Sequence, residues 1–539
     1  MLTGWRRLLP VYVNKSLSGW KIRVFPLQST VWFLGLSLVG YLGVGTALYL
    51  NDRVYRDLTG ISWFDRVYPP RWEEYRVARG NSYVEQAKES LNSGEFSRAF
   101  HQIRAGIGRS PANLEGRLLV ADMLNAFGQP EISDHTLIEG IKFHYNNLPY
   151  IQRTIRQLFS RQKDAEVITL SQNLIARSDL SPRTKLLAAL SLANAYFYRG
   201  HFDQAEDTLE KFNIAQNPEG RLLIAKIEWD RGFQDLAMAL ISQLAIEFPS
   251  NLQIYRTQVQ WLITQDEVDS ARRASLLRRI KYPDQAQPRI DLLYAFDKSD
   301  EDSAVDSEAQ SLFSDFGENY STILQVGDFA ANTGRTQLAE RVFDHAQRNN
   351  QPLPGPALMV VESMIVAGNY RQALEQTTLT MEAHPDWEAE LAPVFNGLQA
   401  ICYHALGERE EASLFLDSYL GLKSTRAENL VAVSERLLSV GANREARRVL
   451  AHAVDHDPLN QAALTRLIEF DLNSPDAPEL PSSLGRLLTM RRASPVLLRD
   501  VYDRLGEDRY HFVQNRDQLL DRLLTALSGK GVFSTGSET

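Results

Sequence analysis

The stretch ALMVVESMIVAGNYRQALEQTTLTMEAHP, residues 357–385, decides the fold. An apolar segment leads into Gly368, a second segment follows it, and Pro385 closes the stretch. Glycine permits the positive φ that ends a helix, and proline cannot continue one. The stretch therefore predicts two helices joined by a tight turn and stopped by a proline. Ala373 stands five residues after the glycine and Pro385 seventeen residues after it.

The same punctuation recurs along most of the chain. The turn glycines are Gly94, Gly128, Gly200, Gly232, Gly334, Gly368, Gly407 and Gly441. Their separations are 34, 72, 32, 102, 34, 39 and 34 residues, and the two long intervals are close to two and three periods of 34. A fixed period of this length predicts a solenoid, in which each unit packs only on its neighbours.

Small residues flank these glycines at fixed distances. Five residues after each glycine stand Ala99, Ser133, Ala205, Ala237, Ala339, Ala373, Ala412 and Ala446. Seven residues before each stand Ala87, Ala121, Ala193, Ala225, Gly327, Val361, Ala400 and Ser434. Two antiparallel helices that share a tight turn approach closely, so the side chains between them must be small.

Period, small residues and prolines together resemble the tetratricopeptide repeat, a helix-turn-helix unit of 34 residues, over about residues 81–460. The resemblance implies an all-α, right-handed solenoid of about ten or eleven units; a helical bundle with coincidental glycines is the alternative. Degenerate copies centre on Asp164 and Ala165, and on a segment without glycine that ends at Pro283. Residues 285–318 fit the repeat poorly, and their acidic run SDEDSAVDSE (299–308) predicts a solvated loop.

Composition limits the classes of function. The chain has 539 residues, 44% hydrophobic and 23% charged, with a net charge of −9. An acidic balance of this kind argues against a nucleic-acid partner, which would favour a basic face. The single cysteine, Cys402, cannot form an intramolecular disulfide, and one cysteine does not reveal the redox compartment.

The N-terminal region predicts a membrane anchor. Residues 1–28 form a basic tail with five Lys or Arg and no acid, and residues 29–50 contain no charge. As a helix these 22 residues would extend ~33 Å, enough to cross a hydrocarbon core of ~30 Å. A signal peptide cleaved after the small residues Gly45 and Ala47, which would release a secreted solenoid, is the alternative.

The flanks of this span predict its orientation. Five basic residues precede the span and three follow it within twenty residues, which favours a cytoplasmic N-terminus and a solenoid outside the cytoplasm. Residues 51–80 form a juxtamembrane linker rich in aromatic residues: Trp63, Phe64, Tyr68, Trp72 and Tyr75. These residues could cap the first repeat or form a belt at the membrane surface.

The repeat pattern fades beyond Pro458. Helices are expected near residues 460–472, 484–492, 496–505 and 516–527. Because a solenoid needs atypical ends to cover its last apolar face, residues 461–528 predict a divergent helical cap. Residues 529–539 are small and polar and predict a disordered tail.

No catalytic, cofactor or metal motif emerges. The chain lacks phosphate-binding, nucleophile-elbow and zinc-protease signatures. Cys402 with His404 is better explained as a packed thiol than as a nucleophile. His452 and His456 lie four residues apart and could share one helix face as metal ligands, but the end of a repeat helix is also an ordinary place for histidine.

The resemblance implies a peptide-binding groove lined by the first helix of each unit. Offsets of ten, six, three and two residues before the turn share one helix face. Candidate groove residues are Leu190, Asn194, Tyr198, Lys226, Trp229, Arg256 and Gln260, and Asp230 shares their face. Aromatic and basic side chains suit peptide capture. The Lys and Asn pattern that captures chaperone tails is incomplete, because Leu190 and Leu223 occupy two of its positions.

The sequence therefore predicts a single-pass, membrane-anchored tetratricopeptide scaffold that binds proteins or peptides, plausibly in envelope assembly, secretion or polymer export. An enzyme or enzyme subunit with its site in the divergent C-terminal region is the alternative.

Overall fold

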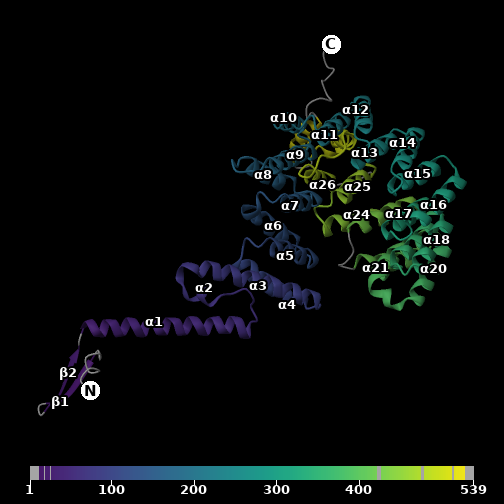
Figure 1. Ribbon diagram of the computed structural model, residues 1–539. Coiled ribbons are helices and arrows are strands. Elements are labelled where there is room, and N and C mark those ends of the chain that lie inside the picture. Colours follow the sequence, from purple (N-terminus) through teal and green to yellow (C-terminus); the bar gives the residue numbers. More distant parts are fainter. Residues whose placement is uncertain are drawn as a thin grey trace. The chain divides into compact units, whose positions relative to one another are not determined.

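The computed structural model describes residues 11–16, 19–24, 26–421, 427–474, 479–512 and 515–527 (Figure 1). The chain divides into two compact units, residues 1–160 with 173–187, and residues 161–172 with 188–539. Both units are built mainly of helices, as the sequence predicts. The tail predicted to be disordered, residues 529–539, lies outside the described residues.

The first unit begins with two features that precede the repeats. Strands β1 (Val11–Ser16) and β2 (Gly19–Val24) pair antiparallel, with Val11 opposite Val24, inside the segment predicted as a basic tail. The long helix α1 (Pro26–Leu50) follows, and its backbone continues through a π-helical turn at Asn51–Tyr55. None of the 25 residues of α1, all of which the structure describes, is buried.

The second helix lies along the end of the first. Helix α2 (Trp63–Val67) contacts α1 through two hydrogen bonds. The Tyr41 hydroxyl donates to the Val67 carbonyl oxygen at 2.8 Å, and the Trp63 indole donates to the Thr46 hydroxyl at 2.8 Å. A glycine permits the close approach, because a Cβ on Gly45 would stand 2.7 Å from Cγ1 of Val67. The aromatic linker is therefore folded against α1.

Helix pairs joined by tight turns make up the rest of the chain to residue 456. In the described chain, which omits residues 422–426, they number eleven, and they are α3 (Trp72–Asn92) with α4 (Phe96–Arg109), α5 (Leu114–Ala126) with α6 (Pro130–His144), α7 (Leu148–Ser160) with α8 (Asp164–Ile175), α9 (Pro182–Tyr198) with α10 (Phe202–Lys211), α11 (Pro218–Asp230) with α12 (Gln234–Glu247), α13 (Leu252–Thr264) with α14 (Val268–Lys281), α15 (Gln287–Lys298) with α16 (Asp302–Phe316), α17 (Tyr320–Thr333) with α18 (Thr336–Arg348), α19 (Pro354–Val366) with α20 (Tyr370–Ala383), α21 (Glu388–Leu406) with α22 (Arg409–Leu420), and α23 (Ala427–Ser439) with α24 (Asn443–His456).

The turns confirm the predicted repeat. All eight turn glycines have positive φ, between 67° and 92°. The remaining three turns use Gln162, Asp266 and Asp300, whose φ values are 56°, 62° and 56°. Gln162 stands 34 residues after Gly128, and Asp266 and Asp300 divide the interval from Gly232 to Gly334 into three steps of 34 residues.

Packing near the turns also agrees with the prediction. The small residues five positions after the turn glycines are at most 5% exposed. Those seven positions before the glycines are buried as well. Helices α4, α12, α20 and α24 each end two residues before a proline that stands seventeen residues after the turn glycine, as Pro385 does after Gly368. The fold is therefore a tetratricopeptide-type solenoid, with its small residues where two helices approach most closely.

The acidic run 299–308 is helical rather than a loop. After the turn at Asp300, helix α16 begins at Asp302 and runs to Phe316. Glu308 is only 4% exposed, and its carboxylate pairs with Arg279 and with Arg289. The loop prediction is wrong because the basic partners of this carboxylate come from two other helices.

Four helices extend the second unit beyond the last repeat. They are α25 (Gln461–Leu472), α26 (Leu480–Leu487), α27 (Pro495–Gly506) and α28 (Arg516–Leu527). The predicted helix at 484–492 is misplaced, because α26 starts four residues earlier and ends at Leu487. Residues 488–494 instead form a non-helical connection to α27.

Candidate interaction site

Residues 489–493, which we call the clasp, return to the early helices of the second unit and contact the end of α9. The Arg492 amide donates to the Tyr198 carbonyl oxygen at 2.8 Å. Arg199 donates from Nη1 to the carbonyl oxygens of Thr489 at 2.6 Å and Met490 at 2.9 Å. The last carbonyl groups of a helix have no partner within it, so the clasp supplies a donor that the end of α9 needs.

A buried ion pair joins the clasp to α8. The guanidinium of Arg491 donates from Nε and Nη2 to both carboxylate oxygens of Asp164, with distances of 2.8 to 3.2 Å. Asp164 is 1% exposed, and it starts α8, where a negative charge is favoured. The Arg491 guanidinium also lies over the Tyr198 ring, 4.1 Å from its centroid. Bidentate pairing and stacking together fix the position of Arg491.

Arg492 of the clasp contacts α10 and α11. Its guanidinium lies 4.5 Å from the centre of the Phe202 ring, and Nη1 donates to the Asp230 carbonyl oxygen at 3.3 Å. Gly200 leaves room for it, because a Cβ there would stand 2.8 Å from Cδ of Arg492. Burial lowers the pKa of Arg492, and the charge of Asp230 partly offsets this effect. Burial raises the pKa of Asp230, against the opposing charges of Arg492 and Lys226.

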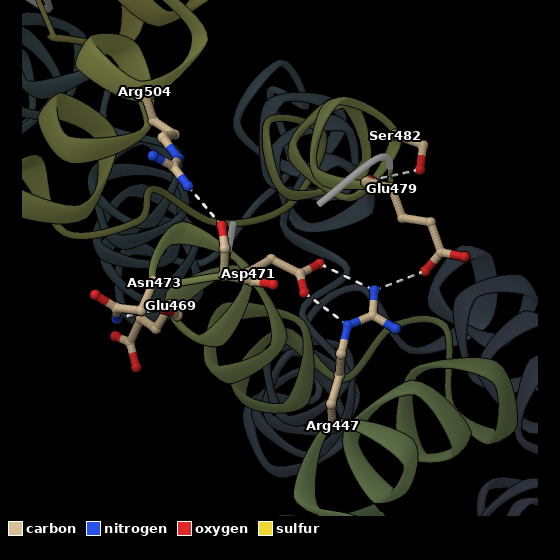
Figure 2. Close-up of polar contacts among 8 residues, drawn as sticks. Arg447, Glu469, Asp471, Asn473, Glu479, Ser482 and Arg504 are labelled. Carbon is tan, nitrogen blue, oxygen red and sulfur yellow. Dashed lines mark hydrogen bonds and ion pairs between the residues drawn. The ribbon is translucent and has the colours of Figure 1, made fainter. Parts of the chain in front are cut away.

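Polar contacts hold the C-terminal helices in register with the last repeat (Figure 2). Arg447 of α24 donates to both carboxylate oxygens of Asp471 in α25, at 2.8 and 3.4 Å, and to Glu479 at 3.2 Å. Asp471 is fully buried, whereas the Arg447 side chain is 31% exposed, so water reaches only the arginine of this pair. Arg504 of α27 donates to the Ser474 carbonyl oxygen at 2.5 Å. These contacts place the connection between α26 and α27 within reach of α9.

The structure brings one of the predicted groove residues, Tyr198, into contact with the clasp, and a second, Lys226, close to Asp230. The Tyr198 carbonyl oxygen accepts a hydrogen bond from the backbone amide of Arg492, and the Tyr198 ring lies beneath the guanidinium of Arg491. Lys226 lies one helical turn before Asp230, and burial lowers the pKa of Lys226 while Asp230 opposes the shift. Part of the predicted groove face is thus in contact with the chain's own C-terminal region.

The other predicted groove residues lie apart from the clasp contacts. Trp229 stacks on Trp261 of α13, with ring centroids 4.4 Å apart and planes within 4°, so it packs between repeats. Asn194 donates to the Leu190 carbonyl oxygen at 2.8 Å. Arg256 is exposed and donates to Gln287 at 2.8 Å, and Gln260 is exposed. A binding role for these residues stays a prediction.

The residues weighed as chemical groups take structural positions. Cys402 is 1% exposed, and burial raises the pKa of its thiol to about 12. His404 lies 3.8 Å from the Glu445 carboxylate, and the rings of His452 and His456 are 6.4 Å apart. Within the described residues, no cluster of three or more His, Cys, Asp or Glu is arranged to hold a metal ion.

Sequence reasoning missed the residues that build the clasp. Asp164 is recognisable only as part of a degenerate repeat, and Arg199 and Phe202 only as neighbours of a turn glycine. The adjacent pair Arg491 and Arg492 was the available signal, since two arginines in a segment bounded by prolines suggest a specific contact. Nothing in the sequence indicates where that contact would lie.

Comparisons with known proteins add little to this description. No protein-family model matches the chain, and no curated protein matches it. Among solved structures, the hetero-tetramer of Cut9 and Hcn1 from the APC/C aligns with a TM-score of 0.31 and 14% identity, covering 91% of this chain and 94% of the other. A complex of Naa15 and Naa10 bound to HypK aligns with a TM-score of 0.26 and 12% identity, covering 91% and 78%. Scores this low carry no argument about function, and the assignment of the fold rests on the helical repeat itself.

Proposed function

We propose that this chain is a membrane-anchored scaffold that binds other proteins through a tetratricopeptide-type solenoid. The observation that carries the proposal is the pairing of eleven repeat units, counted in the described residues, with one apolar helix that leaves all its side chains unburied. A repeat surface built by stacking offers extended contact area rather than a single enclosed site. We assign residues 29–50 to the membrane, 51–80 to a linker that runs into the first turns of α3, 81–460 to the solenoid and 461–528 to its cap.

Helix α1 supports the membrane anchor. Its 25 residues would extend ~38 Å at ~1.5 Å per residue, more than a hydrocarbon core of ~30 Å. It contains no charged residue, and its exposed apolar side chains would face water if no membrane surrounded them. A helix of this composition is costly in water and stable in lipid.

The folded linker supports a position at the membrane surface. Trp63 donates a hydrogen bond to α1, and Trp63, Phe64, Tyr68 and Trp72 remain 39 to 50% exposed. Tryptophan and tyrosine favour the interface between lipid and water, because one part of the ring system is apolar and another is polar. With five basic residues before the span and three after it, we place the N-terminus in the cytoplasm and the solenoid outside it.

The anchor is tested by washing membranes with alkaline carbonate and by sequencing the N-terminus of the mature protein. We expect the full chain to remain in the membrane fraction with residues 26–50 intact. A mature protein that starts near residue 48 would instead establish cleavage and a secreted solenoid. A reporter active only after export, fused after residue 539, tests the orientation and should be active; activity of a cytoplasmic reporter there would reverse the assignment.

The binding surface is tested by crosslinking and pull-down from native membranes with groove variants. Because Trp229 stacks between repeats, its truncation would confuse binding with stability, so the exposed residues Arg256 and Gln260 are better choices. We expect the double variant Arg256→Ala, Gln260→Ala to melt like the parent and to lose a partner. Arg273→Ala, an exposed arginine on the outer helix α14, is the matched control. Retention of every partner by the double variant would place the binding surface elsewhere.

A further inference from the structure

A cavity of about 620 Å³ lies beside the clasp, within the second unit. Three segments line it: residues 199–204 at the turn between α9 and α10, residues from 487 to 493 with Leu498, and residues 522–526 of α28. This volume falls in the range of about 300–1,000 Å³ that is usual for specific ligand sites. The cavity is separate from the predicted groove face, whose residues do not line it.

The cavity has an excess of positive charge although the whole chain is acidic. Its lining includes four arginines and one carboxylate, Asp203. Two of these charges are already compensated, because Asp164 pairs with Arg491 and Arg231 pairs with Asp203. The three that remain are Arg199, Arg492 and Arg522.

These three arginines lack full compensation. Arg199 donates to the carbonyl oxygens of the clasp rather than to a carboxylate. Arg492 shares the charge of Asp230 with Lys226. Arg522 is exposed and makes no ion pair within the residues that the structure describes. Phe202, Leu488, Met490 and Leu498 supply apolar walls beside this charge.

We propose that this cavity binds an acidic segment of a partner protein, with aspartate or glutamate carboxylates on Arg199 and Arg522 and an apolar side chain against the wall. Guanidinium groups pair with carboxylates through two parallel hydrogen bonds, which gives direction as well as charge. The proposal rests on the proposed scaffold function and assigns it a second binding surface, distinct from the groove. The clasp forms one wall of this site, so folding of the C-terminal helices completes it.

The test uses the full chain in detergent and a fluorescent pool of octapeptides, each with two Asp or Glu residues at varied spacing around a Leu or Phe. A matched pool has Asn and Gln in place of the acids. We expect fluorescence polarisation to show binding of the acidic pool and at least about tenfold weaker binding of the amide pool. Arg522→Gln, an exposed change, should weaken binding about tenfold, whereas Arg273→Gln should have no effect.

Three results would overturn the proposal. They are equal binding of the two pools, an unchanged affinity of Arg522→Gln, and displacement of the acidic pool by equimolar inorganic phosphate, which would identify a phosphate site. A fourth result that would overturn it comes from deleting residues 528–539, which follow α28 in the sequence. If the acidic pool binds only after this deletion, the occupant of the cavity is the C-terminal segment of the chain itself and not a partner protein. Capture of partners from membranes by Arg522→Gln, despite lost peptide binding, would leave the scaffold function standing without this site.

Discussion

The ion pair between Asp164 and Arg491 offers the sharpest test of the clasp. The substitution Asp164→Asn keeps the size of the side chain and removes its charge. In the structure this carboxylate is 1% exposed and accepts hydrogen bonds from Nε and Nη2 of Arg491. After the substitution, Arg491 keeps its stacking on Tyr198 but loses the carboxylate that compensates it.

The expected magnitude follows from the burial of the two partners. Breaking a buried pair by removing one partner costs about 3–5 kcal/mol, because the other charge is left uncompensated. The Arg491 side chain is 21% exposed, so water can take over part of its solvation. We therefore expect Asp164→Asn to destabilise the contact by about 2–3 kcal/mol. Arg491→Gln should cost more, since it leaves the more deeply buried carboxylate alone.

Hydrogen exchange measured by mass spectrometry reports which helices lose stability in the Asp164→Asn variant. We expect faster exchange in α8 to α11 and in α26 to α28, with little change in α17 to α22. The matched control is Asp417→Asn, which breaks an exposed pair with Arg448 whose side chains are 55% and 53% exposed, and should cost less than about 1 kcal/mol. A double-mutant cycle of Asp164→Asn with Arg491→Gln should show coupling of the two changes. If Asp164→Asn and Asp417→Asn reduce stability equally, or if the two changes in the cycle are additive, the ion pair between Asp164 and Arg491 does not hold the clasp in place.

Three further predictions concern single residues of the second unit. Because burial raises the pKa of the Cys402 thiol to about 12, iodoacetamide at pH 8 should leave it unmodified in the folded chain and modify it in guanidinium, as mass spectrometry would show; rapid native labelling would contradict this. Burial raises the pKa of Glu362, the charge of Arg436 opposes this shift, and Asp328 adds a smaller increase. Because the folded state then favours the protonated carboxyl, the free energy of unfolding falls as the pH rises through the pKa of Glu362 in the folded chain. Glu362→Gln should therefore stabilise the chain at pH 7 but not below about pH 4, in urea titrations at both values; an equal effect at both would exclude the linkage. Ala373→Leu should overfill a fully buried contact and cost about 1–3 kcal/mol, seen as faster hydrogen exchange in α17 to α22, and unchanged exchange there would show that the position tolerates the larger side chain.

The repeat could be predicted because its determinants are local. A turn glycine needs only its own backbone to adopt positive φ, and an alanine five residues later needs only the adjoining helix. The turns at Gln162 and Asp300 were harder to find, because residues other than glycine can also adopt this conformation. In the acidic run, the burial of Glu308 depends on arginines of other helices, which no local pattern reveals.

The β-hairpin carried a signal that the net positive charge of its segment obscured. In GWKIRV, apolar residues alternate with polar ones, whereas VYVNKS places three apolar residues before three polar ones, and only two residues separate the segments. The clasp is a different case. Residues 484–492 have the composition of a helix, and the reason for ending α26 at Leu487 lies in contacts with α8 to α11.

The distance along the chain between the clasp and its partners has a consequence for synthesis. Arg491 and Asp164 are 327 residues apart, so α8 to α11 leave the ribosome long before the clasp exists. These helices must hold their shape through neighbouring repeats alone until the last helices are made. Loop closure over such a length costs only a few kcal/mol, because the entropic cost grows with the logarithm of loop length. The contacts of the clasp can therefore form only after residues 489–493 have been translated. A chain truncated before residue 489 would contain its repeats but could not make these contacts.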